Sequence, residues 1–192
     1  YGKIDVLWYD VAWPLPTADA WESVSMNTMV RDLQPDIVIN DRSLLDEDFS
    51  TPEEEVAPAA EGRAWEACMT FNGSWGYMPI SPDWRSVREV VLMLSTATAA
   101  QGNLLLNIGP APDGSVPQEA VDRLTAIGKW TAENGEAMYG LVDRAENRTD
   151  WMPTGKWTIK GNTAYYWCHR WPGEELAIGG LRAKVKEASL LS

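Results

Sequence analysis

Polar side chains that could carry chemistry interrupt or follow the short apolar runs of this 192-residue sequence. They are Asp10, the run Asn40-Asp41-Arg42, Glu66, Thr70 and Asn107. Ligands of parallel α/β sheets bind at the carboxyl ends of the strands, so these positions are the first candidates for a site. A period of two places Val6, Trp8 and Asp10 on one strand face, so that an indole lies beside a carboxylate. We therefore expect Trp8 and Asp10 to share a site, unless Asp10 only caps the following turn.

An acidic segment supplies further carboxylates. Residues 46–61 contain seven acids and no base, including three consecutive glutamates that start at Glu53. Such a run is usually a solvated loop, but a carboxylate pair has a specific use at a sugar-binding cleft. One member attacks or stabilises the anomeric carbon, and the other protonates the leaving oxygen. Asp10 with a glutamate of this loop, or with Glu66, fits that use, whereas a calcium site across 46–55 lacks regular ligand spacing.

Aromatic residues and one arginine could bind a flat ligand. The chain has 11 Trp against two Phe, and the flat, half-polar ring of Trp is often used where sugars stack. Trp75 lies in the stretch 71–77, whose glycines allow turns that leave the ring exposed, whereas we expect Trp65 to pack inside. Arg42 ends a strand, where it could pair with Asp41 or orient a carboxylate or a sugar hydroxyl. The residues alone leave both alternatives open.

Composition excludes several other classes of function. With 16 Lys and Arg against 28 Asp and Glu, the formal net charge is −12, so nucleic acid is not an expected partner. No apolar stretch approaches the roughly 20 residues that a membrane span requires. His169 is the only histidine, and Cys68 and Cys168 lie far apart, so spacing predicts no zinc site, disulfide framework or Ser-His-Asp triad.

The elements that must position these residues follow from the apolar runs and from helix punctuation. We predict strands at Ile4–Tyr9, Asp36–Asn40, Ala64–Met69 and Asn103–Ile108, and helices over about residues 18–33, 86–101 and 117–134. Strands that are apolar on both faces and alternate with helices indicate a parallel sheet covered by helices. Asn134-Gly135 predicts a left-handed stop for the last of these helices.

The last quarter of the chain has a different character. Up to and including Glu136 there are 22 acidic and 8 basic residues, net −14, and after it there are 6 acidic and 8 basic residues, net +2. Two compositions suggest two units. From about Tyr139, short apolar runs at Lys156–Lys160, Thr163–Cys168 and Glu175–Ile178 are separated by turns that contain glycine. This pattern predicts hairpins and the beginning of an antiparallel sheet.

Several ordered motifs resemble those of the α-L-fucosidases of glycoside hydrolase family twenty-nine. They are Ile4-Asp-Val-Leu-Trp-Tyr-Asp10, Ile39-Asn-Asp-Arg42, Asp48-Phe-Ser-Thr-Pro-Glu53, Trp65-Glu-Ala-Cys-Met-Thr70, Ser74-Trp-Gly-Tyr77, Gly102-Asn-Leu-Leu-Leu-Asn-Ile-Gly-Pro110 with Asp113-Gly114, and Gly135-Glu-Ala. Their order and gaps over most of the chain make the match specific. The segment after Tyr139 resembles the β-sandwich of the family more loosely.

The resemblance implies a retaining exo-glycosidase that releases α-L-fucose from fucosylated oligosaccharides or glycoconjugates through a covalent glycosyl-aspartate. Asp10 would be the nucleophile. The Thr-Pro-Glu match points to Glu53 as the acid/base, with Glu66 as the second candidate. Arg42 and Trp75 would line the sugar pocket, together with Trp8, which lies next to Asp10 on its strand. The implied mechanism uses no metal and no organic cofactor.

The resemblance also implies an architecture and a competing function. Residues 1–138 would be the C-terminal half of a TIM-like (β/α) barrel, and residues 139–192 the start of an antiparallel β-sandwich. The N-terminal half of the barrel would then be required, since family members take histidines and a tryptophan from it. The family suggests a secreted, periplasmic or lysosomal protein, although this chain shows no leader. The competing function is a non-catalytic, carbohydrate-binding or inactive relative, which would bind an aryl α-L-fucoside without releasing phenol.

Overall fold

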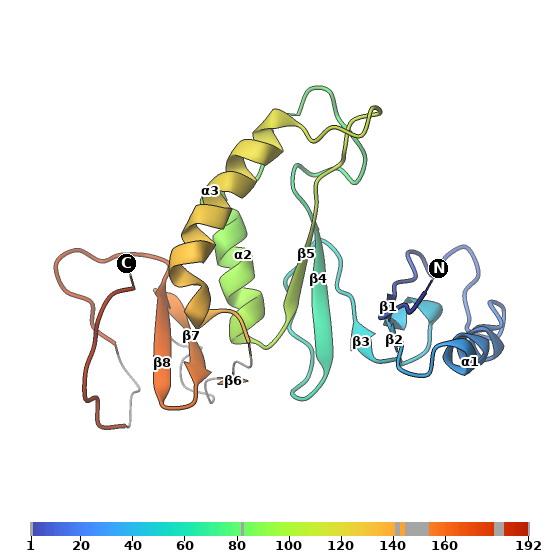
Figure 1. The fold of residues 1–192 in the computed structure, drawn as a ribbon, viewed down its shortest axis with the longest axis horizontal. Coiled ribbons are helices and arrows are strands. Elements are labelled where there is room, and N and C mark those ends of the chain that lie inside the picture. Colours follow the sequence, from blue (N-terminus) through green and yellow to red (C-terminus); the bar gives the residue numbers. More distant parts are fainter. Residues whose placement is uncertain (1, 82, 141–142, 145–153, 179–182, 192) are drawn as a thin grey trace. The chain divides into compact units, whose positions relative to one another are not determined.

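The computed structural model describes residues 2–81, 83–140, 143–144, 154–178 and 183–191. The chain divides into two compact units, Tyr1–Cys68 and Met69–Ser192 (Figure 1). Each unit contains strands and at least one helix, so the chain is a mixed α/β protein, as the sequence predicts. No helix of the described residues is long and apolar enough to cross a membrane.

Short parallel strands form the frame of the first unit. They are β1 (Val6–Leu7), β2 (Val38–Ile39), β3 (Phe49–Ser50) and β4 (Ala64–Thr70), the last of which ends in the second unit. β1 pairs with β2, and β3 pairs with β4, both in parallel. One parallel bridge from Asn40 to Phe49 continues the pairing from β2 to β3. Neighbouring strands therefore follow the chain order, and their carboxyl ends lie at one edge of the unit.

The strands of this unit differ from the prediction in length and number. β1 covers only two of the residues predicted for it, and Val6 is 51% exposed rather than buried. The acidic segment, predicted as a loop, contains β3 and a parallel bridge from Glu53 to Cys68. A two-residue strand is too short to show the alternation by which strands are predicted, and this explains why β3 was missed.

The helix of the first unit, α1 (Ser23–Leu33), begins later than the predicted residue 18. Glu22 has a φ of 55°, in the left-handed region, and this interrupts helical backbone before Ser23. Trp21, expected on the helix, lies in the preceding turn, where its indole N–H donates to the carbonyl oxygens of Ala12 at 3.2 Å and Leu15 at 3.0 Å. The predicted first turn is therefore irregular backbone held by an indole.

The second unit begins with the end of β4 and contains α2 (Val87–Ala99), β5 (Asn103–Asn107) and α3 (Gln118–Asn134). Each of these three elements lies within two residues of its predicted bounds. β5 is next to β4 in the strand order, and the Phe71 N–H donates to the Asn107 carbonyl oxygen at 3.1 Å. The core of this unit contains apolar side chains from α2, from α3 and from the residue that follows β4, namely Phe71, Val90, Ala120 and Ile127.

An antiparallel sheet follows, with the order β6 (Asp143–Arg144), β7 (Gly155–Lys160) and β8 (Thr163–Cys168). β7 and β8 form the predicted hairpin, and β6 was not predicted. Thr158 is fully buried, accepts the Trp167 indole N–H at 2.9 Å and donates to the Ala137 carbonyl oxygen at 2.7 Å. The hairpin is thus bonded to the chain that follows α3.

Two predictions for this part of the chain are wrong. Gly135 has a right-handed φ of −63°, and the helix continues into a 3-10 turn, Gly135–Ala137. The N–H groups of Met138 and Tyr139 both donate to the Gly135 carbonyl oxygen, so the end of the helix needs no left-handed residue. Residues 175–178 are not a strand, and most of their side chains are exposed, so that they offer no apolar face to a neighbour.

We expect Ser86 to stabilise the start of α2. The Ser86 hydroxyl accepts the Glu89 N–H at 3.2 Å, and the Glu89 carboxylate accepts the Ser86 N–H at 2.6 Å, a complete capping box. Ser86→Ala should lower the free energy of unfolding by about 1 kcal/mol in urea titrations of the complete protein. Ser86→Thr, which keeps a hydroxyl that can accept the Glu89 N–H and donate to the Glu89 carboxylate, is the matched control and should stay near wild type. Equal losses in both variants would contradict the capping role.

Candidate active site

The structure gathers five of the six predicted site residues at the strand ends of the first unit. Trp8 and Asp10 follow β1, Arg42 lies in the 3-10 turn after β2, Glu53 follows β3, and Glu66 lies within β4. Direct contacts join all five. Parallel pairing in chain order explains this, because each strand delivers its following residues to the same edge.

The guanidinium of Arg42 contacts both residues that bear the candidate carboxylates. Its Nη2 lies 2.7 Å from Oε2 of Glu53. Its Nη1 donates to the backbone oxygen of Asp10 at 2.6 Å and lies 3.9 Å from Asp10 Oδ1. The Arg42 side chain is only 14% exposed, whereas that of Asp10 is 86% and that of Glu53 is 45% exposed. The cation is therefore held within the protein, and the carboxylates are accessible to a ligand.

Thr51 fixes the stem of this guanidinium. Its hydroxyl accepts the Arg42 Nε–H at 3.0 Å and donates to Asp41 Oδ1 at 3.0 Å, and its carbonyl oxygen accepts from Arg42 Nη2 at 3.4 Å. Arg42 thus pairs with Glu53 and not with its neighbour Asp41, whose carboxylate accepts a hydrogen bond from Thr51. Sequence reasoning missed Thr51, because it follows the strand β3 that the pattern did not reveal.

Trp8 supports the arginine and binds the second candidate glutamate. The Arg42 guanidinium carbon lies 4.5 Å from the centroid of the Trp8 ring. The edge of the same ring donates its indole N–H to Glu66 Oε1 at 3.1 Å. Stacking over a ring face restrains a planar guanidinium and is favourable as a cation–π contact. Trp8 therefore links the strand that carries Glu66 to the residue that binds Asp10 and Glu53.

Asn40 binds the backbone of Tyr9, the residue that precedes Asp10. Its amide oxygen accepts the Tyr9 N–H at 2.9 Å, and its amide nitrogen donates to the Tyr9 carbonyl oxygen at 2.9 Å. A carboxamide can replace a neighbouring strand in this way, because it offers a donor and an acceptor together. Asn40 is fully buried, so the clamp is shielded from water. Its position at a strand end is visible in the sequence, but its partner is not.

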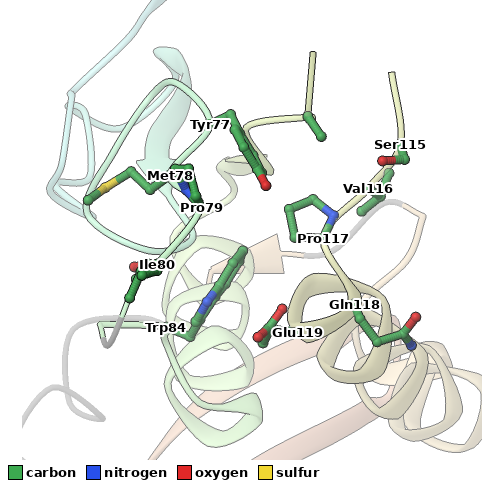
Figure 2. A pocket seen from close by; sticks show the side chains of 12 residues that line it. Tyr77, Met78, Pro79, Ile80, Trp84, Ser115, Val116, Pro117, Gln118 and Glu119 are labelled. Carbon is green, nitrogen blue, oxygen red and sulfur yellow. The ribbon is translucent and has the colours of Figure 1, made fainter. Parts of the chain in front are cut away.

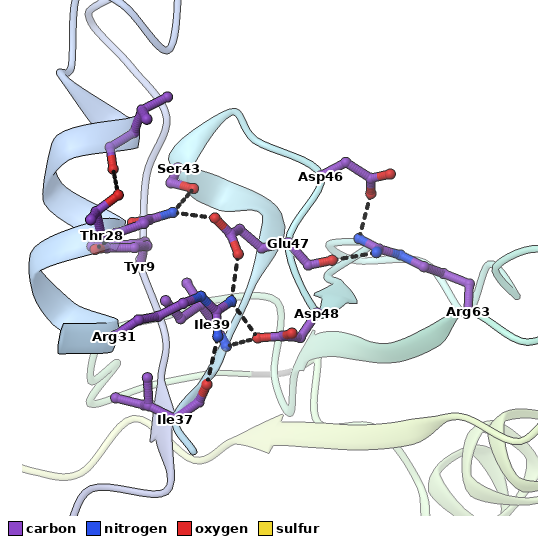
Figure 3. A network of polar contacts seen from close by, with 12 residues as sticks. Tyr9, Thr28, Arg31, Ile37, Ile39, Ser43, Asp46, Glu47, Asp48 and Arg63 are labelled. Atoms are coloured by element: carbon purple, nitrogen blue, oxygen red, sulfur yellow. Dashed lines mark hydrogen bonds and ion pairs between the residues drawn. The ribbon is translucent and has the colours of Figure 1, made fainter. Parts of the chain in front are cut away.

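Arg31 of α1 anchors the acidic segment to β2 (Figure 3). Its Nη2 lies 2.6 Å from Glu47 Oε2 and 2.9 Å from Asp48 Oδ2, and its Nη1 donates to the Ile37 carbonyl oxygen at 3.0 Å. Asp48 Oδ2 also accepts the Ile39 N–H at 2.7 Å. These acids are therefore structural counter-ions that fix the approach of the chain to Glu53.

A second arginine binds the start of the same segment. Arg63 Nη2 lies 2.8 Å from Asp46 Oδ1, and its Nη1 donates to the Glu47 carbonyl oxygen. Several acids that the sequence offered for a calcium site are thus paired with arginines. Across the described residues, no group of three or more His, Cys, Asp or Glu side chains is arranged to hold a metal ion.

Cys68 lies beneath the site but is not suited to act as its nucleophile. Its side chain is buried, and burial raises the pKa of the thiol. The charge of Arg42 lowers that pKa, whereas the charges of Glu53, Glu66 and Asp10 raise it. A neutral thiol is a weak nucleophile. The exposed carboxylates are therefore the groups available for chemistry.

Trp75, the sixth predicted residue, belongs to the second unit. Its ring is 42% exposed, and its carbonyl oxygen accepts from the Asn107 side-chain amide at 2.9 Å. A cavity of about 530 Å³ in this unit lies between the loop after Trp75 and the start of α3, with Tyr77, Trp84 and Pro117 on its walls (Figure 2). Trp75 does not line this cavity.

The arrangement in the first unit suits acid/base and nucleophilic chemistry on a neutral ligand. Asp10 and Glu53 present carboxylate oxygens on either side of a fixed cation. Arg42 can also orient an oxygen of the ligand between them, since a guanidinium offers five N–H donors in one plane. Glu66 contacts Trp8 through Oε1, whereas Glu53 pairs with the same guanidinium that binds residue 10.

Similarity to known proteins extends over most of the chain. The family described as Alpha-L-fucosidase matches residues 1–136. The tissue alpha-L-fucosidase of Homo sapiens is 32% identical over 186 residues, which cover 88% of this chain and 39% of that protein. The Alpha-L-fucosidase of Dictyostelium discoideum is 31% identical over 175 residues, which cover 82% of this chain and 37% of that protein.

Solved structures give the same result. Alpha-L-fucosidase isoenzyme 1 from Paenibacillus thiaminolyticus superposes with a TM-score of 0.77 at 33% identity, covering 85% of this chain and 42% of that one. The Thermotoga maritima alpha-fucosidase in complex with fucose gives 0.69 at 30% identity, covering 84% and 38%. This chain spans about two fifths of the length of these relatives.

The Asp48 ion pair predicts a dependence of stability on pH. Burial alone would raise the pKa of Asp48, but hydrogen bonds from the Ile39 N–H and Arg31 hold it below its ordinary value of 3.8. A lowered folded pKa means that the stabilisation is present above pH 3.8 and is lost as the pH falls through the folded pKa. Asp48→Asn should therefore be less stable than wild type at pH 7, by at most about 1 kcal/mol for a partly exposed pair.

Urea midpoints measured from pH 7 to pH 2.5 test this dependence. The difference between wild type and Asp48→Asn should shrink once the pH falls below that ordinary pKa. Asp36→Asn, at an exposed acid in the same unit, is the control and should show a smaller difference throughout. A gap that stays constant down to the lowest pH would show that the Asp48 charge does not stabilise the fold.

Proposed function

Because the chain belongs to the α-L-fucosidase family, we propose that the complete protein hydrolyses α-L-fucosides with retention at the anomeric carbon. The observation that carries this proposal is the single cation, Arg42, bound both to Asp10 and to Glu53. A glycosidase needs one carboxylate at the anomeric carbon and another at the leaving oxygen, with a defined separation between them. A guanidinium that binds the backbone of residue 10 and the carboxylate of Glu53 keeps both residues at one edge.

In the proposed mechanism, Asp10 attacks the anomeric carbon as the bond to the leaving oxygen breaks. Glu53 donates a proton to that oxygen, and a fucosyl-Asp10 ester forms. Glu53, now a carboxylate, takes a proton from water. The water oxygen attacks the anomeric carbon, and the ester bond to Asp10 breaks. Two inversions give net retention, and no step requires a metal or an organic cofactor.

Arg42 and Trp8 are proposed to bind the sugar alongside Asp10. The arginine can donate to a sugar oxygen, and its low exposure keeps it in place before substrate arrives. Trp75 is proposed as a sugar-binding residue on the strength of the sequence resemblance alone. Fucose bound to the Thermotoga maritima relative supports a fucose-sized ligand for this family.

Glu53 must change partners during this reaction. Its Oε2 lies 2.7 Å from Arg42 Nη2, so the carboxyl group has to turn away from the arginine to reach a glycosidic oxygen. A sugar oxygen that takes over the Arg42 donor would release it. This same engagement is the observation that favours the alternative, a carbohydrate-binding relative without turnover, in which Glu53 never leaves Arg42.

The proposed architecture is the C-terminal half of a TIM-like barrel in residues 1–138 and the start of a β-sandwich in residues 139–192. Parallel neighbours in chain order within the first unit support the barrel, and the β6-β7-β8 sheet supports the sandwich. The relatives are more than twice as long as this chain. We propose that the remaining barrel strands come from sequence outside it.

We expect Asp10→Ala and Asp10→Asn to lose turnover of aryl α-L-fucosides by at least about 10³-fold, as the loss of a nucleophile does. Folding should be nearly unchanged, because Arg42 binds the backbone oxygen of residue 10. Added azide should restore part of the rate in the alanine variant and yield β-fucosyl azide, detected by NMR. Asp5→Asn, at an exposed acid on the same segment, is the control. Unchanged turnover in both Asp10 variants would remove Asp10 from the mechanism.

We expect Glu53→Ala to retain the attack on fucosides with very good leaving groups, which need little protonation, and to lose hydrolysis of natural glycosides. Rates for a series of aryl fucosides with different leaving-group pKa values measure this. Glu55→Ala, at an exposed neighbour, should behave like wild type. If the leaving-group dependence arose instead in Glu66→Ala, with Glu53→Ala normal, the acid/base would be Glu66.

A further inference from the structure

The side chain of Glu66 is tied to the rest of the site by one hydrogen bond that spans 58 residues of sequence. Its Oε1 accepts the indole N–H of Trp8 at 3.1 Å. An indole N–H can only donate, so the Glu66 oxygen serves there as an acceptor. The bond pins the edge of the Trp8 ring to β4 and leaves its face to other partners.

That face carries the Arg42 guanidinium at 4.5 Å from the ring centroid. The guanidinium is planar, so the tilt of the Trp8 ring sets the plane in which Arg42 directs its donors. Two of those donors go to the Asp10 backbone oxygen and to Glu53. A rotation of Trp8 would therefore move the atoms that hold the Asp10 backbone and the Glu53 carboxylate.

Three successive contacts thus connect Glu66 to the reacting residues. We propose that Glu66 is a positioning residue, which acts through Trp8 to set the orientation of Arg42 and with it the separation of Asp10 and Glu53. The proposal rests on the proposed function for the identity of the reaction. It assigns Glu66 no proton transfer, because its contact with Asp10 and Glu53 runs through Trp8 and Arg42.

An acceptor role and an acid role respond differently to an amide. Glutamine keeps a carbonyl oxygen for the Trp8 N–H but cannot donate a proton as a carboxylic acid does. Glu66→Gln should therefore work almost as well as wild type if the residue positions Trp8. Trp8→Phe keeps a ring face under Arg42 and removes the N–H, so it should mimic Glu66→Ala. Glu66→Ala and Trp8→Phe remove the same hydrogen bond, so the variant that combines them should be little less active than either single variant.

The test measures kcat/KM of the complete protein on aryl α-L-fucosides with good and poor leaving groups. We expect Glu66→Gln to stay within about threefold of wild type. Glu66→Ala and Trp8→Phe should each lose about 10- to 100-fold, the size of a misplaced catalytic group. Glu66→Gln should show the same dependence on leaving-group pKa as wild type, and its pH–rate profile should keep both limbs. Glu61→Gln, at an exposed acid, controls for loss of charge.

Two results would overturn the proposal. One is a Glu66→Gln variant as impaired as Glu66→Ala, and the other is a loss in Glu66→Gln that grows with leaving-group pKa or removes a limb of the pH profile. Either would make Glu66 a catalytic acid/base. If wild type binds fucose but releases no phenol, the proposed hydrolytic function is wrong, whereas the positioning role of Glu66 can still be tested. Calorimetry then measures the fucose affinity of each variant, and Glu66→Gln should bind more tightly than Glu66→Ala and Trp8→Phe. Equal affinities in Glu66→Gln and Trp8→Phe would refute the positioning role there.

Discussion

The planar fork of one guanidinium, that of Arg42, meets residues delivered by three neighbouring strands. It follows β2, contacts Asp10 after β1, and contacts Thr51 and Glu53 after β3. Since the N–H groups of arginine are fixed relative to one another, a displacement of any one strand end would break contacts at the others. Burial of this cation, at 14% exposure, is compensated by its carboxylate and carbonyl partners. The positions of the residues that follow β1, β2 and β3 therefore all depend on the position of the Arg42 guanidinium.

The strands themselves contribute little to this order. β1, β2 and β3 are two residues long, so their ladders supply few hydrogen bonds. Side chains extend the pairing where the ladder stops, as Asn40 does for the Tyr9 backbone and Asp48 does for the Ile39 N–H. Side-chain to backbone bonds of this kind compete well with regular structure in short, irregular segments. The site is thus built at the point where secondary structure ends and side-chain bonding takes over.

Sequence reasoning found the elements that depend on local chemistry. Ser86 gives a cap, and the β7–β8 hairpin follows from alternation and turns, so both could be predicted closely. Sequence periodicity does not show a strand of two residues such as β3. Nor does it show the left-handed backbone of Glu22, which delays the start of α1. For the site, strand-end position singled out Asp10 and Arg42, whereas Thr51 could only be found once β3 was known. Contacts such as Trp8 to Glu66 lie 58 residues apart and require the fold.

The bond from Arg42 to residue 10 uses a backbone oxygen, which every amino acid possesses. The architecture of the edge is thus insensitive to which side chain stands at that position, and the Asp10 side chain itself is 86% exposed and makes few structural contacts. In evolutionary terms, chemistry and scaffold are separable here. A duplicated gene could exchange this aspartate in one step and still encode the same strand edge around the same arginine. Loss of the exposed carboxylate and loss of the fold are therefore separate evolutionary events for this protein.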